Sequence, residues 1–478
     1  MSEELVLVVK RDCPTCTMLE SVYEQLHGGA IPLSVYSQDD PTFPESIEAV
    51  QHDERLEKSY RLDIEIVPTL IKLADGKEQG RTFGWHRGDW QDLSGVPDLG
   101  PDLPDSQPGC GAKNVDPGMR EVLMVRFGDV DIGARKVELG DYDDPLESCF
   151  ERGWTDGLPV VPPTDERIVR MLAATDRAPT EIVGLIPPNR VACTVEKVAI
   201  NAVMAGCRPE YFPLVLGIVE AALIPEFAMH GLLCTTYFSG PTIIVNGPIA
   251  RALGMNSGGN CLGQGNRANL TIGRALQLLI RNVGGGVPGG IDRSTFGNPG
   301  KITFCFAEDE SDPDWTPLSV ARGFAPGASA VTLFHGDGVQ AFTDQKSRTP
   351  EALARSMGMA LNAVGHPKLV ECSNAILVLS PEHYAIFKEA GWGRQAIEEA
   401  IHAGTEREGA DIVAGAHGVG EGMGSGYAQG RYRKFWPDHG LLIVRAGGQA
   451  GLFSAIIGGW IGGGNRDVVQ PVTMEIGT

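Results

Sequence analysis

The stretch that decides the fold of the N-terminal part is Leu5-Val-Leu-Val-Val-Lys10, followed by Cys13-Pro14-Thr15-Cys16. The first run is short and rich in valine, which predicts a buried β-strand rather than a helix. Apolar residues then recur at helical spacing from Met18 to Leu26. We therefore expect the two thiols to lie where a strand passes into the N-terminus of a helix.

This position gives the first thiol a distinct chemistry. Unpaired backbone N–H groups and the helix dipole stabilise a thiolate at a helix N-terminus and lower its pKa. We predict that Cys13 is the attacking sulfur and that Cys16, one helical turn on, is the resolving sulfur. A single Cys-x-x-Cys is also half of a zinc site, but no second pair of cysteines or closely spaced histidines follows in this part of the chain.

Three further β-rich segments complete the N-terminal part, at residues 31–36, 64–73 and 81–85, with an Asp75-Gly76 turn before the last. With Cys13-Pro14-Thr15-Cys16 and Val67-Pro68-Thr69, residues 1–95 resemble the thioredoxin fold in a compact, glutaredoxin-like layout. The resemblance implies a redox-active disulfide as the working group and places Pro68 at the fold's cis-proline. The Trp-Cys-Gly-Pro-Cys context of thioredoxin itself is absent.

Residues 96–145 are predicted to form a linker, because their first part is rich in proline, glycine and aspartate. Cys110 lies within this linker between Gly109 and Gly111, so its thiol is expected to be accessible. One hypothesis is that Cys110 shuttles electrons between the Cys13/Cys16 pair and the next domain. The alternative is that it is an incidental loop cysteine.

Residues 146–478 have the pattern of a large, glycine-rich α/β domain. Three segments repeat a plan of apolar strand, Gly- or Pro-containing loop and helix, at residues 242–253, 375–390 and 441–457. Continuous apolar strands that alternate with helices predict a mostly parallel sheet covered on both faces. Ligands of such sheets bind at the carboxyl ends of the strands, so the three loops are candidates for a substrate site.

The large domain resembles an uncharacterised bacterial domain. The resemblance rests on the proline-rich segment Trp154–Pro163 and on Thr194-Val195-Glu196-Lys197. That domain is associated with redox-partner proteins, including the UGSC family of (seleno)proteins. The resemblance implies thiol or selenol chemistry and names no catalytic residue.

The densest group of polar residues leads into a predicted helix at 270–281 and contains Asn256, Ser257, Asn260, Asn266, Arg267 and Asn269. Glycines between them let backbone N–H groups approach a ligand, and a helix N-terminus favours an anion. A dinucleotide site is disfavoured because Ala268 replaces the third glycine of the fingerprint. The loop is therefore predicted to bind an anionic or polar substrate, unless its asparagines only stabilise the loop itself.

Other candidates for chemistry follow predicted strands in the large domain. Glu308 and His335 are candidates for an acid/base pair, and Lys301 is a candidate for substrate binding. Most cysteines here fall within apolar runs, but Cys261 lies in the polar loop and is the candidate reactive thiol. The histidines form no close cluster, so the sequence favours no metal site, although it leaves a metal ion open.

Composition narrows the function classes. The 61 acidic and 40 basic residues give a formal charge of -21, which disfavours a nucleic-acid partner. No apolar run reaches the roughly 18 residues of a membrane span, and the first residues are acidic, so a cytoplasmic protein with no membrane partner is expected. Ten scattered cysteines predict free thiols. The expected partners are a small-molecule substrate and an external reductant, and a homo-oligomer is left open.

Two functions from different classes fit these features. In the first, the Cys13/Cys16 pair supplies electrons to a small-molecule reaction in the large domain, and fusion raises their effective concentration. In the second, the large domain is a non-redox lyase or hydrolase, metal-assisted or not, and the N-terminal domain keeps a thiol reduced. A scaffold or chaperone-like role ranks last, because the Asn- and Gly-rich loops are more elaborate than a scaffold requires.

Overall fold

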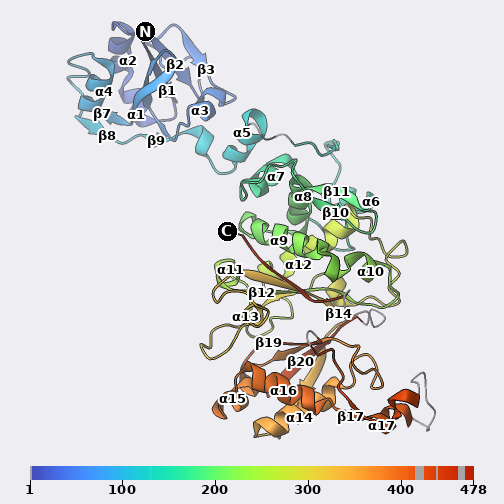
Figure 1. Cartoon of the computed structure of the whole chain (residues 1–478). Coiled ribbons are helices and arrows are strands. Elements are labelled where there is room, and N and C mark those ends of the chain that lie inside the picture. The colour runs from blue at the N-terminus through green and yellow to red at the C-terminus, as the bar shows by residue number, and fades with distance from the viewer. Residues whose placement is uncertain are drawn as a thin grey trace. The chain divides into compact units, whose positions relative to one another are not determined.

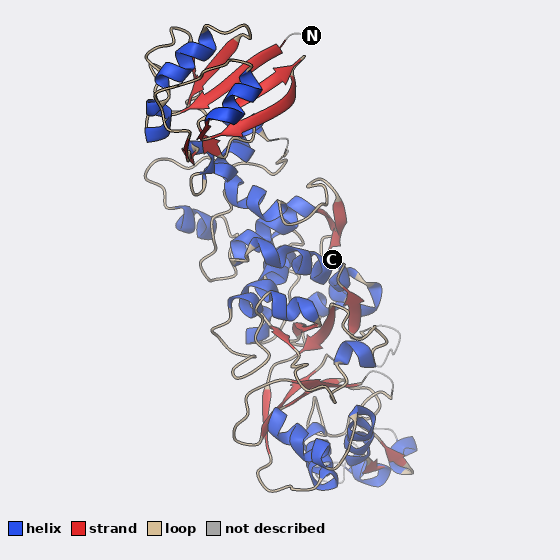
Figure 2. Ribbon diagram, turned by 90° about the vertical axis from the view of Figure 1, so that its left-hand side faces the viewer, coloured by secondary structure: helices blue, strands red, loops and turns tan. Residues whose placement is uncertain are grey.

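The computed structural model describes residues 3–128, 130, 132–414, 425–437, 440–460 and 469–477. The chain divides into two compact units, Met1–Asp131 and Ile132–Thr478. Both units combine helices with sheets, which confirms the predicted α/β class (Figures 1 and 2). The stretch 96–145, predicted as a separate linker, is divided between the two units.

The first unit is built on a five-stranded sheet in the order β3-β2-β1-β5-β6. The central strand β1 runs parallel to β2 and antiparallel to β5. The bounds of the strands and helices of this part are β1 Glu3–Val9, α1 Pro14–Met18, α2 Glu20–His27, β2 Leu33–Ser37, β3 Val50–His52, α3 Glu57–Arg61, β5 Thr69–Ala74, β6 Lys77–Phe83 and α4 Arg87–Ser94.

Burial explains why β1 is the centre of this unit. All five residues of Leu5–Val9 are buried, so both faces of the strand contact other elements. Val22 and Leu26 of α2 and Trp90 of α4 belong to the same core. Each such large apolar side chain contributes about 1.5–3 kcal/mol on burial, which favours one arrangement of strands and helices.

Residues after α4 also belong to the first unit, and they form short strands that pair with earlier ones. Strand β8 (Ser106–Gln107) pairs with β7 (Trp85–His86), and β9 (Cys110–Gly111) pairs with β4 (Ile66–Val67). The helices η1 (Lys113–Val115) and α5 (Met119–Phe127) follow. The first part of the predicted linker is thus an ordered edge of the unit.

The second unit contains two four-stranded sheets, in the orders β13-β12-β14-β21 and β15-β20-β16-β19. The prediction of a mostly parallel sheet is wrong for both. In each sheet one strand pair is parallel and two are antiparallel. The strands are β12 Gly240–Asn246, β13 Cys305–Ala307, β14 Ala330–Gly336, β15 Gln340–Thr343, β16 Ala375–Leu379, β19 Leu441–Arg445, β20 Phe453–Gly458 and β21 Val472–Glu475.

The continuous apolar runs reflect burial on both faces rather than strand direction. In β16, Ile376 and Val378 contribute to a core that includes Ile244 and Phe334 of the other sheet. The alternate residues of β16, such as Leu377, contribute to the helix-covered core on the opposite face. An antiparallel strand buried in this way shows the same pattern as a parallel one. The helix expected at the end of the third repeated segment, residues 452–457, is instead strand β20, whose residues are buried in the same two cores.

Helices cover the outer faces of the two sheets, so the second unit has four layers (Figure 1). Helices α9 and α12 contact the β12 sheet, and α14, α15 and α16 pack on the β16 sheet. The helices and short strands are α6 Pro145–Glu151, α7 Asp165–Leu172, β10 Ile182–Ile186, β11 Val191–Thr194, α8 Val195–Ala205, α9 Phe212–Leu223, α10 Met229–Cys234, α11 Pro248–Ala252, α12 Arg267–Asn282, α13 Leu318–Ala321, α14 Pro350–Leu361, α15 Pro381–Glu389, α16 Arg394–Gly404, β17 Arg407–Glu408, α17 Gly409–Ala414 and β18 Arg431–Tyr432.

No single helix among the described residues is both long and apolar enough to cross a membrane. The helical stretches Pro209–Leu223 and Pro225–Cys234 reach the required length and composition only when taken together, and a bend of 71° separates them.

Candidate functional site

The first candidate centre is the thiol of Cys13, which caps the N-terminus of α1. Its backbone is extended (φ −146°, ψ 111°), and its sulfur accepts a hydrogen bond from the Cys16 backbone N–H at 3.4 Å. Sγ also lies 3.6 Å from the carbonyl oxygen of Val67. The Val67–Pro68 peptide bond is cis, so Pro68 has the predicted conformation beside the thiols. The predicted strand-to-helix position of Cys13 is confirmed.

The surroundings of the two cysteines give their thiols opposite acidities. A hydrogen bond from the Cys16 thiol, assisted by the Cys110 thiol and by backbone N–H groups, lowers the pKa of Cys13 to about 5 against the opposing effect of burial. Burial and the hydrogen bond to Cys13 raise the pKa of Cys16. Cys13 is therefore the group that ionises at neutral pH, while Cys16 stays protonated beside it.

Cys110 completes a cluster of three thiols. The β9 strand sets Cys110 directly opposite Val67, the residue before Pro68. The Cys110 thiol donates a hydrogen bond to the Cys13 sulfur, and burial together with this contact raises the pKa of Cys110. The accessible loop thiol predicted from the flanking glycines is thus a half-buried strand residue next to Cys13.

The segment that carries Cys110 packs against the thiol centre. Thr15 Oγ1 donates a 2.7 Å hydrogen bond to the carbonyl of Pro108. Gly109 sits so close to β4 that an added Cβ would lie 2.6 Å from the Val67 carbonyl oxygen and would also meet Ile66. Cys13 retains only 1% exposure. Because Cys13 is buried, we expect exchange with an external molecule to require a local opening, and the packed segment that carries Cys110 is the candidate for that movement.

Cys261 in the second unit does not have the surroundings of a reactive thiol. Its residue is 4% exposed and belongs to the core between the two sheets. Burial raises its pKa to about 11, although backbone N–H groups of Leu262 and Gly447 oppose the shift. Cys261 is therefore a loop residue whose side chain is buried in the core.

The asparagines of the polar loop bind the loop itself. Asn269 accepts from the Asn256 backbone N–H and donates to the carbonyls of Asn256 and Cys261. Asn260 donates to Gln264, and Asn266 caps α12 by accepting from the Asn269 N–H. Of the alternatives for this loop, the geometry favours the one in which asparagines stabilise turns.

The remaining predicted substrate residues are engaged as well. The Ser257 carbonyl accepts from Gly447 N–H. Arg267 Nε donates to the Gly206 carbonyl. Lys301 Nζ binds both carboxylate oxygens of Asp292 at 2.7 Å. Arg267 is exposed, and its contact with Gly206 occupies only one of its guanidinium donors.

Glu308 and His335 are not brought together. Glu308 lies beside the C-terminal end of β12, where its backbone N–H bonds Val245, whereas His335 pairs with Pro241 near the other end. The length of β12 separates them by on the order of 15 Å. His335 is fully buried, stacks on Phe227 and contacts its carbonyl at 2.5 Å, and burial lowers its pKa to about 4.

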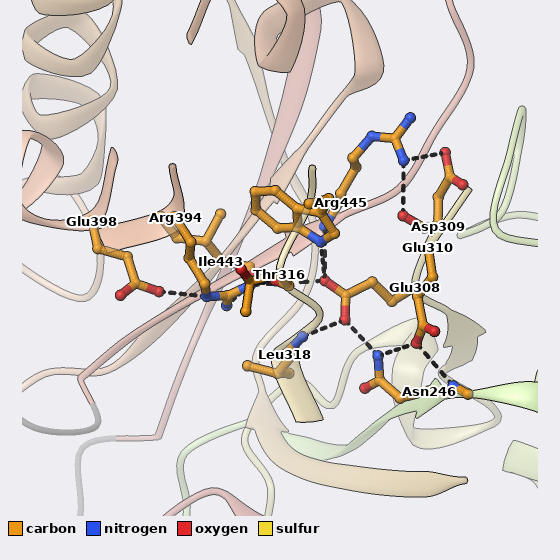
Figure 3. A network of polar contacts seen from close by, with 12 residues as sticks. Asn246, Glu308, Asp309, Glu310, Thr316, Leu318, Arg394, Glu398, Ile443 and Arg445 are labelled. Atoms are coloured by element: carbon orange, nitrogen blue, oxygen red, sulfur yellow. Dashed lines mark hydrogen bonds and ion pairs between the residues drawn. The ribbon is translucent and has the colours of Figure 1, made fainter. Parts of the chain in front are cut away.

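Glu308 instead forms a polar network between the two sheets (Figure 3). Its carboxylate accepts from Trp315 Nε1 at 2.8 Å, the Leu318 N–H at 2.7 Å and Asn246 Nδ2 at 2.5 Å. Arg394 lies 4.0 Å away. Burial raises the pKa of Glu308, while Arg394 and the hydrogen bonds oppose that shift. Because both oxygens are occupied, the carboxylate connects strands rather than facing a ligand.

A pair of side chains that the sequence pattern did not place correctly lies on α10. Residues 235–238 have the composition of a strand, but the residues before them, Met229–Cys234, form a helix. His230 Nε2 therefore lies 3.5 Å from the sulfur of Cys234, and both residues are exposed. The i, i+4 spacing of the two residues is typical of a shared helix face. The spacing does not show that a helix begins after Ala228, whose φ is 53°.

Among the described residues, no group of three or more His, Cys, Asp or Glu side chains is arranged to hold a metal ion. Searches for related proteins also returned nothing: no family model matches the chain, and no curated protein or solved structure is significantly similar to it.

Proposed function

We propose that the first unit is a thiol–disulfide oxidoreductase of the thioredoxin type, and that its Cys13/Cys16 pair supplies electrons to a small-molecule reaction of the second unit. The observation that carries the proposal is the Cys13 sulfur at a helix N-terminus, with its pKa lowered to about 5 beside a protonated Cys16. The sheet order β3-β2-β1-β5-β6 and the cis peptide before Pro68 support the fold assignment.

The proposed half-reaction begins with the thiolate of Cys13. It attacks one sulfur of a substrate disulfide, a mixed disulfide forms, and the other substrate sulfur leaves as a thiolate that takes up a proton. The Cys16 thiol then loses its proton and attacks the Cys13 sulfur. The substrate departs as its second thiol, and Cys13–Cys16 is left as the disulfide. Two electrons have moved, and an external dithiol of lower potential restores the pair.

Cys110 adds an internal exchange partner. Its strand places it opposite Val67, whose carbonyl lies 3.6 Å from the Cys13 sulfur, and each of the two thiols shifts the pKa of the other. If Cys110 carries a mixed disulfide with a small thiol, the Cys13 thiolate attacks the Cys110 sulfur, releases that thiol and passes the bond on to Cys16. This supports the shuttle role over the incidental one.

A trapping experiment tests the proposal. In Cys16→Ser the mixed disulfide cannot be resolved, so mild oxidation should accumulate a Cys13–Cys110 bond that is detectable by non-reducing peptide mass spectrometry. Cys372→Ser, which alters a half-buried thiol of the second unit, is the control. Turnover that survives Cys13→Ser/Cys16→Ser, with and without added reductant, would remove the redox mechanism.

The lyase or hydrolase alternative gains no support, because its acid and base candidates lie at opposite ends of β12. A cytoplasmic location remains part of the proposal, since free thiols and the redox role fit a reducing compartment.

A further inference from the structure

The second unit contains a cavity of about 950 Å³, within the range of cavities that hold small molecules. The helices α6, α7 and α8 line it together with the proline-rich segment after Trp154 and the extended residues 132–139. None of the residues predicted from sequence for substrate binding belongs to this lining.

Two helices present a continuous face to the cavity. Lining residues of α8 are Lys197, Ile200, Asn201 and Met204, which follow the i, i+3, i+4, i+7 spacing of one helical stripe. Residues 145, 148, 149 and 152 of α6 and its C-terminal cap repeat the same spacing on another wall. The cavity is therefore built by helix faces and is not a gap between loops.

Hydrogen bonds fix the remaining walls. The buried carboxylate of Glu196, next to Lys197, accepts from the backbone N–H groups of Gly133 and Ala134 at 3.2 and 2.9 Å. Asn282 donates to both the Asn201 side chain and the Trp154 carbonyl, at 2.9 and 3.1 Å. Hydrogen bonds of the chain itself therefore fix residues 132–139 and the backbone of Trp154.

The charge of the lining is opposite to that of the chain. Five cationic side chains line the cavity, compared with two carboxylates: Arg135, Lys136, Arg152, Arg167 and Lys197 against Glu138 and Asp165. The chain as a whole carries a formal charge of -21. A concentration of positive charge in such a chain raises the local concentration of anions.

Among the described residues only one of the five cations, Lys136, pairs with a carboxylate, that of Asp165. Two of the others, Arg152 and Lys197, have contacts with uncharged groups. Lys197 Nζ donates to the Ala192 carbonyl at 2.8 Å, and the Arg152 guanidinium lies over the Trp154 ring, 5.8 Å from its centroid. Lys197 belongs to the same lining stripe of α8 as the apolar side chains of Ile200 and Met204. A bound anion would supply the charge partner that the chain does not.

We infer that this cavity binds a small molecule with an apolar body and a single anionic group, such as a carboxylate. The apolar body contacts Trp154, Ile200 and Met204, and the anion lies near Arg152 and Lys197. This inference goes beyond the redox role and does not depend on it.

Isothermal titration calorimetry on the full-length chain tests the inference with decanoate, decanol and inorganic phosphate. Decanoate should bind one molecule per chain. Decanol, which lacks the charge, and phosphate, which lacks the apolar body, should each bind at least about tenfold more weakly. Equal binding of decanol or phosphate, or no binding of decanoate, overturns the proposal.

Variants locate the site. Arg152→Met and Lys197→Met should each weaken decanoate binding by roughly tenfold, since each removes a charge but keeps an unbranched side chain. Arg251→Met, on the exposed surface of α11 outside the lining, should leave binding unchanged. Unchanged binding in the Arg152→Met/Lys197→Met double variant overturns the assignment. A Trp154→Phe variant should still bind but should lose the fluorescence change on titration.

Discussion

Cys13 in the first unit and Glu308 in the second are both buried ionisable groups, but their hydrogen bonds differ in what they favour. Around Cys13 hydrogen bonds from the Cys16 thiol, the Cys110 thiol and backbone N–H groups favour the charged sulfur and outweigh burial. Around Glu308 the carboxylate is equally buried, but both oxygens are occupied by groups of the chain. Burial with unused bonding capacity points to chemistry, whereas burial with complete hydrogen bonding points to structural support.

The strongest test of this comparison removes the sulfur itself. Cys13→Ser should reduce disulfide exchange with a small aromatic disulfide by roughly a thousandfold or more, because a hydroxyl is not ionised at neutral pH. The rate at which the aromatic thiolate is released measures the rate of exchange. Cys372→Ser should retain the wild-type rate, and exchange that persists in Cys13→Ser would assign the reactivity to another thiol.

The next test removes the buried carboxylate of Glu308. Glu308→Ala should lower the free energy of unfolding of the second unit by about 3–5 kcal/mol, because it leaves the buried donors of Trp315, Leu318 and Asn246 without this acceptor. Denaturant titration followed separately for each unit measures the loss. Glu389→Ala, an exposed carboxylate on α15, should change stability by less than about 0.5 kcal/mol. Exchange at Cys13 should be unaffected in both variants.

A third test sharpens the comparison by opening the thiol centre. Gly109→Val should displace β9, because any Cβ at this position meets Ile66 and the Val67 carbonyl. Cys13 should then be alkylated on the order of tenfold faster, since closing the segment limits access. Gly111→Val is the matched control, because no atom lies within 4 Å of a Cβ added there. Equal alkylation rates in the two variants would contradict the covering role.

The smallest effect concerns pH. The folded pKa of Cys13, about 5, lies below the unfolded value of roughly 8.5, so the thiolate stabilises the reduced protein. This contribution is fully present above the unfolded pKa and is lost as the pH falls through the folded pKa. Chemical denaturation of reduced wild type and Cys13→Ser between pH 5 and 9 should show a stability difference that shrinks toward acid pH. A pH-independent difference would contradict the lowered pKa.

Local patterns predicted the thiol centre well. Cys13 and Cys16 follow a buried strand and begin a helix, because strand and cap depend on neighbouring residues. The cis peptide before Pro68 was expected only from the resemblance to the thioredoxin fold. Cys110 opposite Val67 depends on a pairing between segments more than forty residues apart, which no local spacing encodes.

In the second unit several predictions were wrong because they concerned features that depend on distant segments of the chain. Apolar runs established that the strands are buried, but strand direction depends on how distant segments are connected. Glu308 and His335 each follow or end a strand, yet only the register of β12 shows that they lie at opposite ends. The polar loop contained enough asparagines to satisfy its own backbone, which composition alone does not distinguish from ligand binding.

The pairing of β9 with β4 also bears on which disulfides could react in the proposed exchange. A polypeptide that would add as a strand along β4 must first displace a piece of backbone that is already hydrogen-bonded there. A small disulfide needs only a brief local opening wide enough for two sulfur atoms. We therefore expect the chain to discriminate among disulfides by molecular size, excluding protein clients before any chemical preference applies.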